Sequence, residues 1–140
     1  MSKTILVIDD DSQYREVVEH ILLDNGYDPA VVACPDEAFK LLADQQFDLI
    51  MCDLHMPFTL DEHMSEFQYS DQVGIKTLEE LRWVFPELPI LAVSSTPAWQ
   101  LRKMIEEIPS VVALSKPFSS KALMSLIEVI LQNDGCRQVH

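Results

Sequence analysis

Acidic, hydroxyl and basic side chains recur in this chain close to the points where short apolar runs end. Three consecutive aspartates, residues 9–11, follow the first of these runs, and Asp53 follows another. Ser94 and Lys116 come just after two later runs. Any one of these residues is also common as a helix cap or a turn residue, but their recurrence after separate runs indicates a shared site.

Carboxylates gathered in one pocket would require a counter-charge. Two like charges about 4 Å apart repel by roughly 4 kcal/mol at an effective dielectric near 20, so Asp9, Asp10 and Asp53 together need a proton or a cation. Oxygen ligands favour a hard ion, and Mg²⁺ commonly combines a few carboxylates with waters and a substrate phosphate. The residue types therefore predict a Mg²⁺ site for phosphoryl transfer.

Charge also suggests a role for each residue in such a site. A phosphoryl group in transit is stabilised by cations, here Mg²⁺ and the Lys116 ammonium, and the Ser94 hydroxyl would donate to one of its oxygens. Asp53 is the expected nucleophile because it stands alone at the end of its run, whereas Asp9 and Asp10 form a pair suited to metal binding.

Strands and helices are expected to alternate along the chain and to carry these residues to one edge of a sheet. Strands are predicted for the apolar runs, which cover 5–8, 30–33, 49–52, 90–93 and 111–114. Helices are predicted from helical apolar spacing over 14–22, after Pro35, over 75–84, after Pro97 up to Ile108 and after Ser120. This alternation predicts an α/β fold with a doubly wound, five-stranded parallel sheet, whose ligands bind beyond the carboxyl ends of the strands.

Composition narrows the class of protein. A length of 140 residues fits one domain, 1–140, and 48% apolar residues can fill its core. The net charge of −13 would repel a nucleic-acid backbone, so no direct nucleic-acid contact is expected, and no apolar run predicts membrane insertion. Three cysteines without a CxxC pair are typical of a reducing compartment, which predicts a cytoplasmic protein without disulfides or structural zinc.

Four segments of the chain resemble the receiver domain of two-component response regulators. They are ILVIDDD (5–11), DLIMCDLHMP (48–57), ILAVSS (90–95) and LSKPF (114–118), in the order of that family and spread over nearly the whole chain. The resemblance implies a flavodoxin-like receiver fold. It also implies a signalling domain that assists its own phosphorylation and dephosphorylation, rather than an enzyme.

The same resemblance implies a role for each residue of the acidic pocket. Asp53 would be the phosphoacceptor, Asp10 a direct Mg²⁺ ligand and Asp9 a second acidic ligand. His55 would contribute its backbone carbonyl to the metal.

The remaining roles concern signalling. Ser94 corresponds to the switch hydroxyl of receivers and Lys116 to their lysine, with a cis bond to Pro117. The phosphoryl donor would be a sensor histidine kinase or a histidine phosphotransfer protein. Phosphorylation would shift the population between inactive and active conformations, in which Ser94 moves toward the phosphate and the helix that follows repacks.

Two features depart from the receiver pattern. Residues 58–73 form an extended connection after the third strand, longer than α/β units need. This connection could recognise a partner, gate phosphate access, cover another surface or have no role. Ala113 stands where receivers commonly carry an aromatic residue that reports phosphorylation. His63 and its acidic neighbours give a weak indication of a second metal site, and Trp99 is expected to be exposed, as a partner contact or as an ordinary surface aromatic.

Two other functions are compatible with parts of the sequence. A haloacid-dehalogenase-like phosphatase also uses an aspartate after its first strand, but it requires a further acidic pair that does not follow the last strand here. A receiver-like binding module that works without phosphorylation would explain Ala113 and the long connection. The complete set of charges in the predicted pocket favours the phosphoacceptor.

Overall fold

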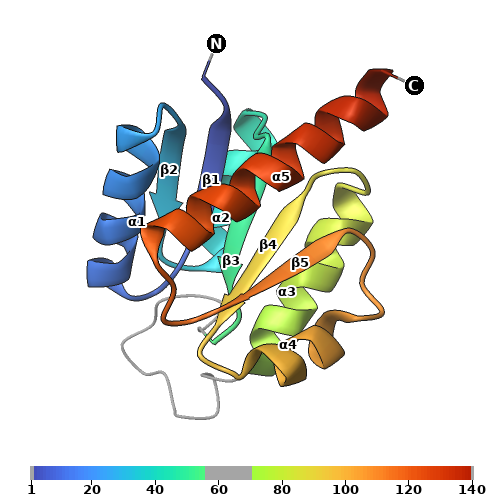
Figure 1. Cartoon of the computed structure of the whole chain (residues 1–140). Coiled ribbons are helices and arrows are strands. Elements are labelled where there is room, and N and C mark those ends of the chain that lie inside the picture. The colour runs from blue at the N-terminus through green and yellow to red at the C-terminus, as the bar shows by residue number, and fades with distance from the viewer. Residues whose placement is uncertain (1, 56–70, 140) are drawn as a thin grey trace.

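Five parallel strands form one sheet in the computed structural model, which describes residues 2–55 and 71–139 (Figure 1). The strands are β1 (Thr4–Ile8), β2 (Asp28–Val32), β3 (Leu49–Asp53), β4 (Ile90–Ser94) and β5 (Val111–Ser115). The helices are α1 (Ser12–Asp24), α2 (Pro35–Asp44), α3 (Asp71–Val84), α4 (Ala98–Ile105) and α5 (Ser120–Val139). Their alternation and the strand order β2-β1-β3-β4-β5 confirm the predicted doubly wound α/β fold.

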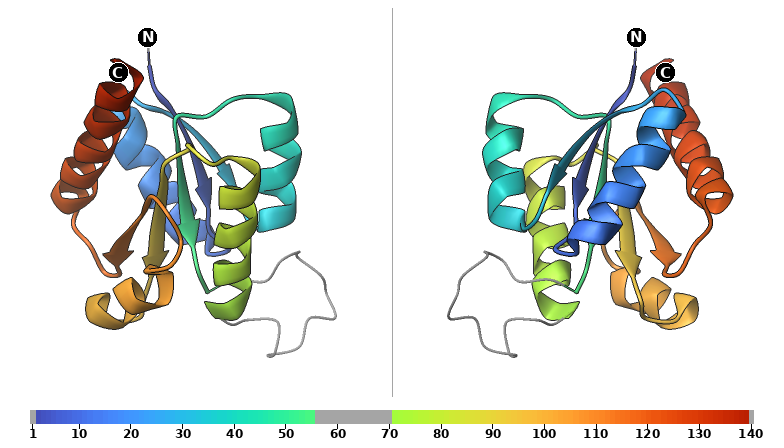
Figure 2. Two further views of the ribbon diagram at one scale, coloured as in Figure 1. Left: turned by 90° about the vertical axis from the view of Figure 1, so that its right-hand side faces the viewer. Right: turned by 90° about the vertical axis from the view of Figure 1, so that its left-hand side faces the viewer.

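Helices cover both faces of the sheet. α1 and α5 lie on one face, and α2, α3 and α4 lie on the other (Figure 1; Figure 2). Side chains that alternate along the strands enter two separate cores: Val7 and Met51 pack with α1 and α5, whereas Leu6 and Ile50 pack with the other three helices. Because both faces are covered, the central strands are apolar throughout.

The chain winds in two directions from β1. β2 pairs with one side of β1 and β3 with the other, and β4 and β5 then follow in order. The winding reverses between β1 and β3, so the ends of these strands, at Ile8 and Asp53, border the place where such sheets bind ligands.

Several predicted element boundaries differ from the structure. β2 begins at Asp28, two residues before the predicted 30–33. The apolar pattern misses this start because the edge strand is mostly half-buried and its first residue is exposed. α4 ends at Ile105, although the apolar spacing continues to Ile108. Pro109 disfavours helical backbone at the residue before it, which explains an end short of that position.

α3 also begins earlier than predicted. It starts at Asp71 instead of residue 75, so the last three residues of the predicted connection 58–73 are helical. Residues 56–70, including His63 and the acidic residues around it, lie outside the described part of the chain.

A glycine allows α3 to approach the end of β3. A Cβ at Gly74 would collide with the backbone of Leu54, the residue that follows Asp53. Glycine has no Cβ, so the helix can pack against this strand end. The contact supports the segment that carries Asp53.

A buried arginine connects α3 to two loops. Arg82 donates from Nε to the Pro109 carbonyl at 2.7 Å and from Nη2 to the Ser110 carbonyl at 3.0 Å. Its Nη1 donates to the carbonyls of Phe85 and Leu88 at 2.8 and 2.7 Å. Arg82 thereby satisfies backbone acceptors in the α3–β4 and α4–β5 connections, which regular secondary structure leaves without partners.

Candidate functional site

Three carboxylates meet at the carboxyl ends of β1 and β3. One carboxylate oxygen from each of Asp9, Asp10 and Asp53 lies within 4.8 Å of the other two. The pairing of Ile8 with Cys52 brings the two strand ends level, so the residues that follow are neighbours. Asp9 and Asp53 are buried and Asp10 is half-buried. The structure thus brings together the aspartates for which the sequence predicts metal binding.

The ammonium group of Lys116 reaches this cluster from the end of β5. Its Nζ lies 2.9 Å from Asp9 Oδ2 and 3.6 Å from Asp53 Oδ2. Its backbone N–H donates to the Ser94 carbonyl at 2.8 Å, which extends the pairing of β4 with β5. The Lys116–Pro117 peptide bond is cis, as predicted.

Both carboxylate oxygens of Asp9 have hydrogen-bond partners. Oδ1 accepts from the Asp11 N–H at 3.0 Å, and Oδ2 accepts from Lys116. Asp53 Oδ1 accepts from the His55 N–H at 3.3 Å. Asp9 is therefore suited to orient the lysine, whereas the half-buried Asp10 is better placed to take a cation that arrives from solvent.

Burial and crowding oppose ionisation of the cluster. Burial and the Asp9 carboxylate raise the pKa of Asp53 to about 7, although Lys116 and a backbone hydrogen bond act in the opposite direction. Burial and the Asp9 carboxylate also raise the pKa of Asp10. Burial lowers the pKa of Lys116, but Asp53 and Asp9 outweigh burial and raise it overall. The pocket therefore holds more negative charge than Lys116 neutralises.

The donor set fits a hard divalent cation. The clustered ligand atoms are carboxylate oxygens, and their excess negative charge is what a dication would neutralise. A pocket of this composition suits Mg²⁺, which retains waters and therefore needs a partly open side such as that at Asp10. The carboxylates of Asp10 and Asp53 would hold the ion, with Asp9 beside them.

Ser94 lies at the end of β4 with its hydroxyl turned to the next loop. It is buried, and its Oγ donates to Thr96 Oγ1 at 3.1 Å and accepts from the Thr96 N–H at 3.2 Å. Ser115 Oγ donates to the Thr96 carbonyl at 2.7 Å. Pairing of Asp53 with Val93 places Ser94 at the same sheet edge as the acidic cluster. The two serines thus hold the β4–α4 loop through Thr96.

Two residues beside the acidic cluster make contacts that the sequence analysis does not predict. Tyr14 belongs to the apolar stripe of α1, yet its ring lies under the Lys116 ammonium, with Nζ 3.9 Å from the ring centroid. Asp11 belongs to the acidic run, yet it caps α1 by accepting from the N–H groups of Gln13 and Tyr14. The cap could have been predicted from its place before the helix, but no spacing pattern indicates the contact with Lys116.

The raised pKa of Asp53 predicts a pH-dependent stability. The ordinary value of 3.8 applies to the unfolded chain, so between about pH 4 and pH 7 the folded state binds more protons and loses stability as the pH rises. Asp53→Asn removes this loss. Without divalent cations, the stability advantage of the variant over wild type should grow by about 2–3 kcal/mol between about pH 5 and pH 8, measured by urea unfolding. A stability advantage that does not change with pH would contradict this prediction. Mg²⁺ should stabilise wild type more than it stabilises the variant.

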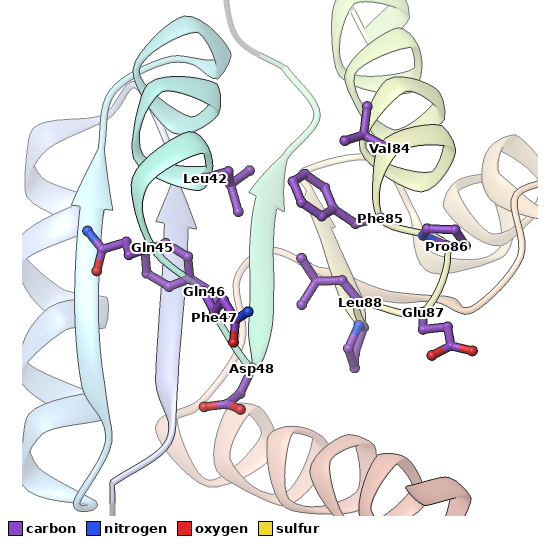
Figure 3. A pocket seen from close by; sticks show the side chains of 11 residues that line it. Leu42, Gln45, Gln46, Phe47, Asp48, Val84, Phe85, Pro86, Glu87 and Leu88 are labelled. Atoms are coloured by element: carbon purple, nitrogen blue, oxygen red, sulfur yellow. The ribbon is translucent and has the colours of Figure 1, made fainter.

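A large hollow lies at the opposite end of the sheet from the acidic cluster. It has a volume of about 840 Å³, and Leu42, Phe47, Val84, Phe85 and Leu88 contribute apolar side chains to it (Figure 3). Its lining includes Asp48 and Pro89, which immediately precede β3 and β4, so it lies away from the carboxylates. The hollow is therefore separate from the candidate site.

Both tryptophans lie on the surface. Trp99, on α4, is 64% exposed, which confirms the prediction. Trp83, on α3, is 87% exposed, and no pattern in the sequence predicts this exposure.

Ala113 pairs with Ala92 across β4 and β5, so two small side chains stand side by side where receivers commonly have an aromatic residue on β5. Within the described residues, none of the helices is long and apolar enough to cross a membrane.

Comparison with known proteins agrees with the fold and with the family that the sequence resembles. Residues 5–128 match the family model of the response regulator receiver domain. Relatives include the transcriptional regulatory protein ZraR of Escherichia coli, 25% identical over 127 residues, which cover 91% of this chain and 26% of ZraR. The response regulator protein FleR of Pseudomonas aeruginosa is 28% identical over 129 residues, which cover 91% of this chain and 24% of FleR. The chain thus spans about a quarter of the length of these relatives.

Solved structures share the whole fold. A CheY-like receiver domain protein from Methanospirillum hungatei superposes with a TM-score of 0.81 at 20% identity, covering 98% of this chain and 99% of the other. The chemotaxis protein CheY4 of Vibrio cholerae gives a TM-score of 0.77 at 22% identity, covering 93% and 99%. The match to the receiver family rejects the alternative of a haloacid-dehalogenase-like phosphatase. The chain belongs to the response regulator receiver domains, the receiver modules of two-component signalling.

Proposed function

We propose that this receiver accepts a phosphoryl group on Asp53 from the phosphohistidine of a sensor kinase or a histidine phosphotransfer protein in the cytoplasm. The observation that carries the proposal is the position of the Asp53 carboxylate, which lies beside two other carboxylates and 3.6 Å from the Lys116 ammonium. A site that places a dication and a lysine ammonium around one carboxylate suits the transfer of a highly charged group.

The transfer exchanges one bond to phosphorus for another. A carboxylate oxygen of Asp53 forms the new O–P bond as the N–P bond of the donor imidazole breaks, and the imidazole keeps the electron pair. Lys116 stabilises the charge on the phosphoryl oxygens, and Asp9 orients its ammonium through the 2.9 Å contact. Bound Mg²⁺, held by Asp10, Asp53 and the His55 carbonyl, would neutralise the negative charge that the phosphoryl group brings.

Signalling would begin at Ser94. When its hydroxyl turns to donate to a phosphoryl oxygen, it gives up its two hydrogen bonds to Thr96. The β4–α4 loop is then held less firmly, and α4 can shift to a second position. This route needs no aromatic residue at position 113. The output would be a protein contact, because the net charge of −13 disfavours nucleic acid.

A binding module that works without phosphorylation is the second candidate, and Ala113 is the observation that favours it. Since the receiver family is a family of signalling domains, we propose no turnover of other substrates. Both candidates share the fold and differ in whether the acidic pocket is used.

Incubation of the wild-type protein with acetyl phosphate and Mg²⁺ tests the proposal. Mass spectrometry of the intact protein should show the gain of one phosphoryl group, and borohydride reduction followed by peptide mapping should locate it at Asp53. EDTA should prevent the gain. If the wild type gains no phosphoryl group and binds no beryllofluoride, the binding module is the correct function.

A further inference from the structure

The face of the Tyr14 ring covers one side of the Lys116 ammonium. Nζ lies 3.9 Å from the ring centroid, well within the range of a cation–π contact. The other near partners of this ammonium are Asp9 Oδ2 at 2.9 Å and Asp53 Oδ2 at 3.6 Å. The ammonium is thus enclosed by two carboxylates and an aromatic face.

A ring contact and a backbone hydrogen bond hold Tyr14 in place. Phe118 packs against Tyr14 edge to face, with centroids 5.7 Å apart and planes at 79°. The backbone N–H of Tyr14 donates to the capping carboxylate of Asp11 at 3.3 Å, in the first turn of α1. Tyr14 also lines a small cavity together with Asp9 and Asp53. The ring therefore stands at the site in a defined position.

A lysine needs such support because its four-carbon stem is flexible. Part of its rotamer freedom is lost each time the ammonium must meet a phosphoryl oxygen. Asp9 and Asp53 attract the ammonium, but the phosphoryl group would sit on Asp53 and change that contact. The ring is a neutral partner whose attraction does not depend on the state of Asp53.

We propose that Tyr14 is a positioning residue for phosphoryl transfer, whose ring holds the Lys116 ammonium at the place where the phosphoryl oxygens arrive. The proposal rests on the proposed function of Asp53. The aromatic face provides the effect, so the phenol hydroxyl is dispensable. Leucine fills much of the space of the ring but has no quadrupole to attract a cation.

The test compares rates of phosphorylation by acetyl phosphate in the presence of Mg²⁺. Tyr14→Leu should slow the reaction about fivefold, the factor that corresponds to a cation–π contact of ordinary strength, whereas Tyr14→Phe should retain most of the wild-type rate. Tyr27→Leu is the matched control, because Tyr27 is also half-buried against the same core. Its rate should equal that of wild type, and urea unfolding should verify that each variant is folded.

Nuclear magnetic resonance supplies a second measurement that does not require phosphorylation. The ring current of an aromatic residue at this distance should shift the ε-methylene protons of Lys116 upfield in wild type and in Tyr14→Phe. The shift should disappear in Tyr14→Leu. A normal rate in Tyr14→Leu, equal slowing in Tyr14→Phe, or no upfield shift in wild type would each overturn the proposal.

The two measurements separate this proposal from the one on which it rests. If wild type gains no phosphoryl group, the proposed function of Asp53 fails, and the role of Tyr14 in transfer fails with it. If wild type is phosphorylated and the Tyr14 variants behave alike, only the positioning role fails.

Discussion

Replacement of Asp53 by asparagine is expected to abolish phosphoryl uptake from acetyl phosphate. Asparagine keeps the size of the side chain and one oxygen acceptor, but its neutral amide is not a nucleophile toward phosphorus, so the acyl phosphate bond cannot form. The rate should fall at least about a hundredfold, and intact-protein mass spectrometry should detect no phosphoryl gain. The variant should remain folded, because it removes a buried charge from a crowded acidic pocket.

Asp11→Asn provides the matched control. Asp11 belongs to the same acidic run, but it caps α1 by accepting from the N–H groups of Gln13 and Tyr14 at 3.0 and 3.3 Å. Asparagine is an equally good cap, so this variant should be phosphorylated like wild type. An unchanged phosphoryl gain in Asp53→Asn would reject Asp53 as the acceptor. Loss of uptake in both variants would show that general acidity, and not Asp53, controls the reaction.

Replacement of Arg82 by methionine should be strongly destabilising. The guanidinium makes four hydrogen bonds to backbone carbonyls in two loops, and methionine supplies none of them. A buried acceptor that loses its partner costs roughly 1–3 kcal/mol, and the cost per carbonyl is lower here because water can reach part of these two loops. We expect a loss of about 2–4 kcal/mol in the free energy of unfolding, measured by urea denaturation.

Two further variants define the cause of that loss. Arg102→Met removes an exposed arginine from α4 and should change stability by less than about 0.5 kcal/mol. Arg82→Lys keeps the charge but replaces the planar fork by one ammonium, so its stability should lie between those of wild type and Arg82→Met. If Arg82→Lys matches wild type, charge and not the set of hydrogen bonds is responsible. If Arg82→Met lowers the free energy of unfolding by less than about 1 kcal/mol, the two loops do not depend on Arg82 for their stability.

Most of the candidate site could be predicted from residue types placed after apolar runs. Parallel strands end at one edge, so residues that follow them must be neighbours, whatever the details of packing. Asp9, Asp53 and Lys116 are close together for this reason, although Lys116 and Asp9 are 107 residues apart. Ser94 follows the same rule in part: it lies at that edge, but its hydroxyl is bonded to Thr96.

Element boundaries were harder to predict where local pattern and burial disagree. The edge strand β2 is mostly half-buried, so only part of it is strongly apolar, and its apolar run begins two residues after the strand does. α3 begins before its apolar stripe does, because its first turn contains only one apolar side chain large enough to pack, Val73. In both cases tertiary contacts extend an element beyond the residues whose periodicity indicates it.

Residue types and their order along the chain were sufficient for the winding of the sheet and for the charges at its edge, because both follow from the geometry of parallel strands. Packing of the helices decided the rest. The Tyr14 ring meets Lys116, Arg82 reaches two loops, and Trp83 faces solvent because of the way in which α1 and α3 are rotated against the sheet. That rotation depends on the fit of many side chains at once, which no local pattern encodes.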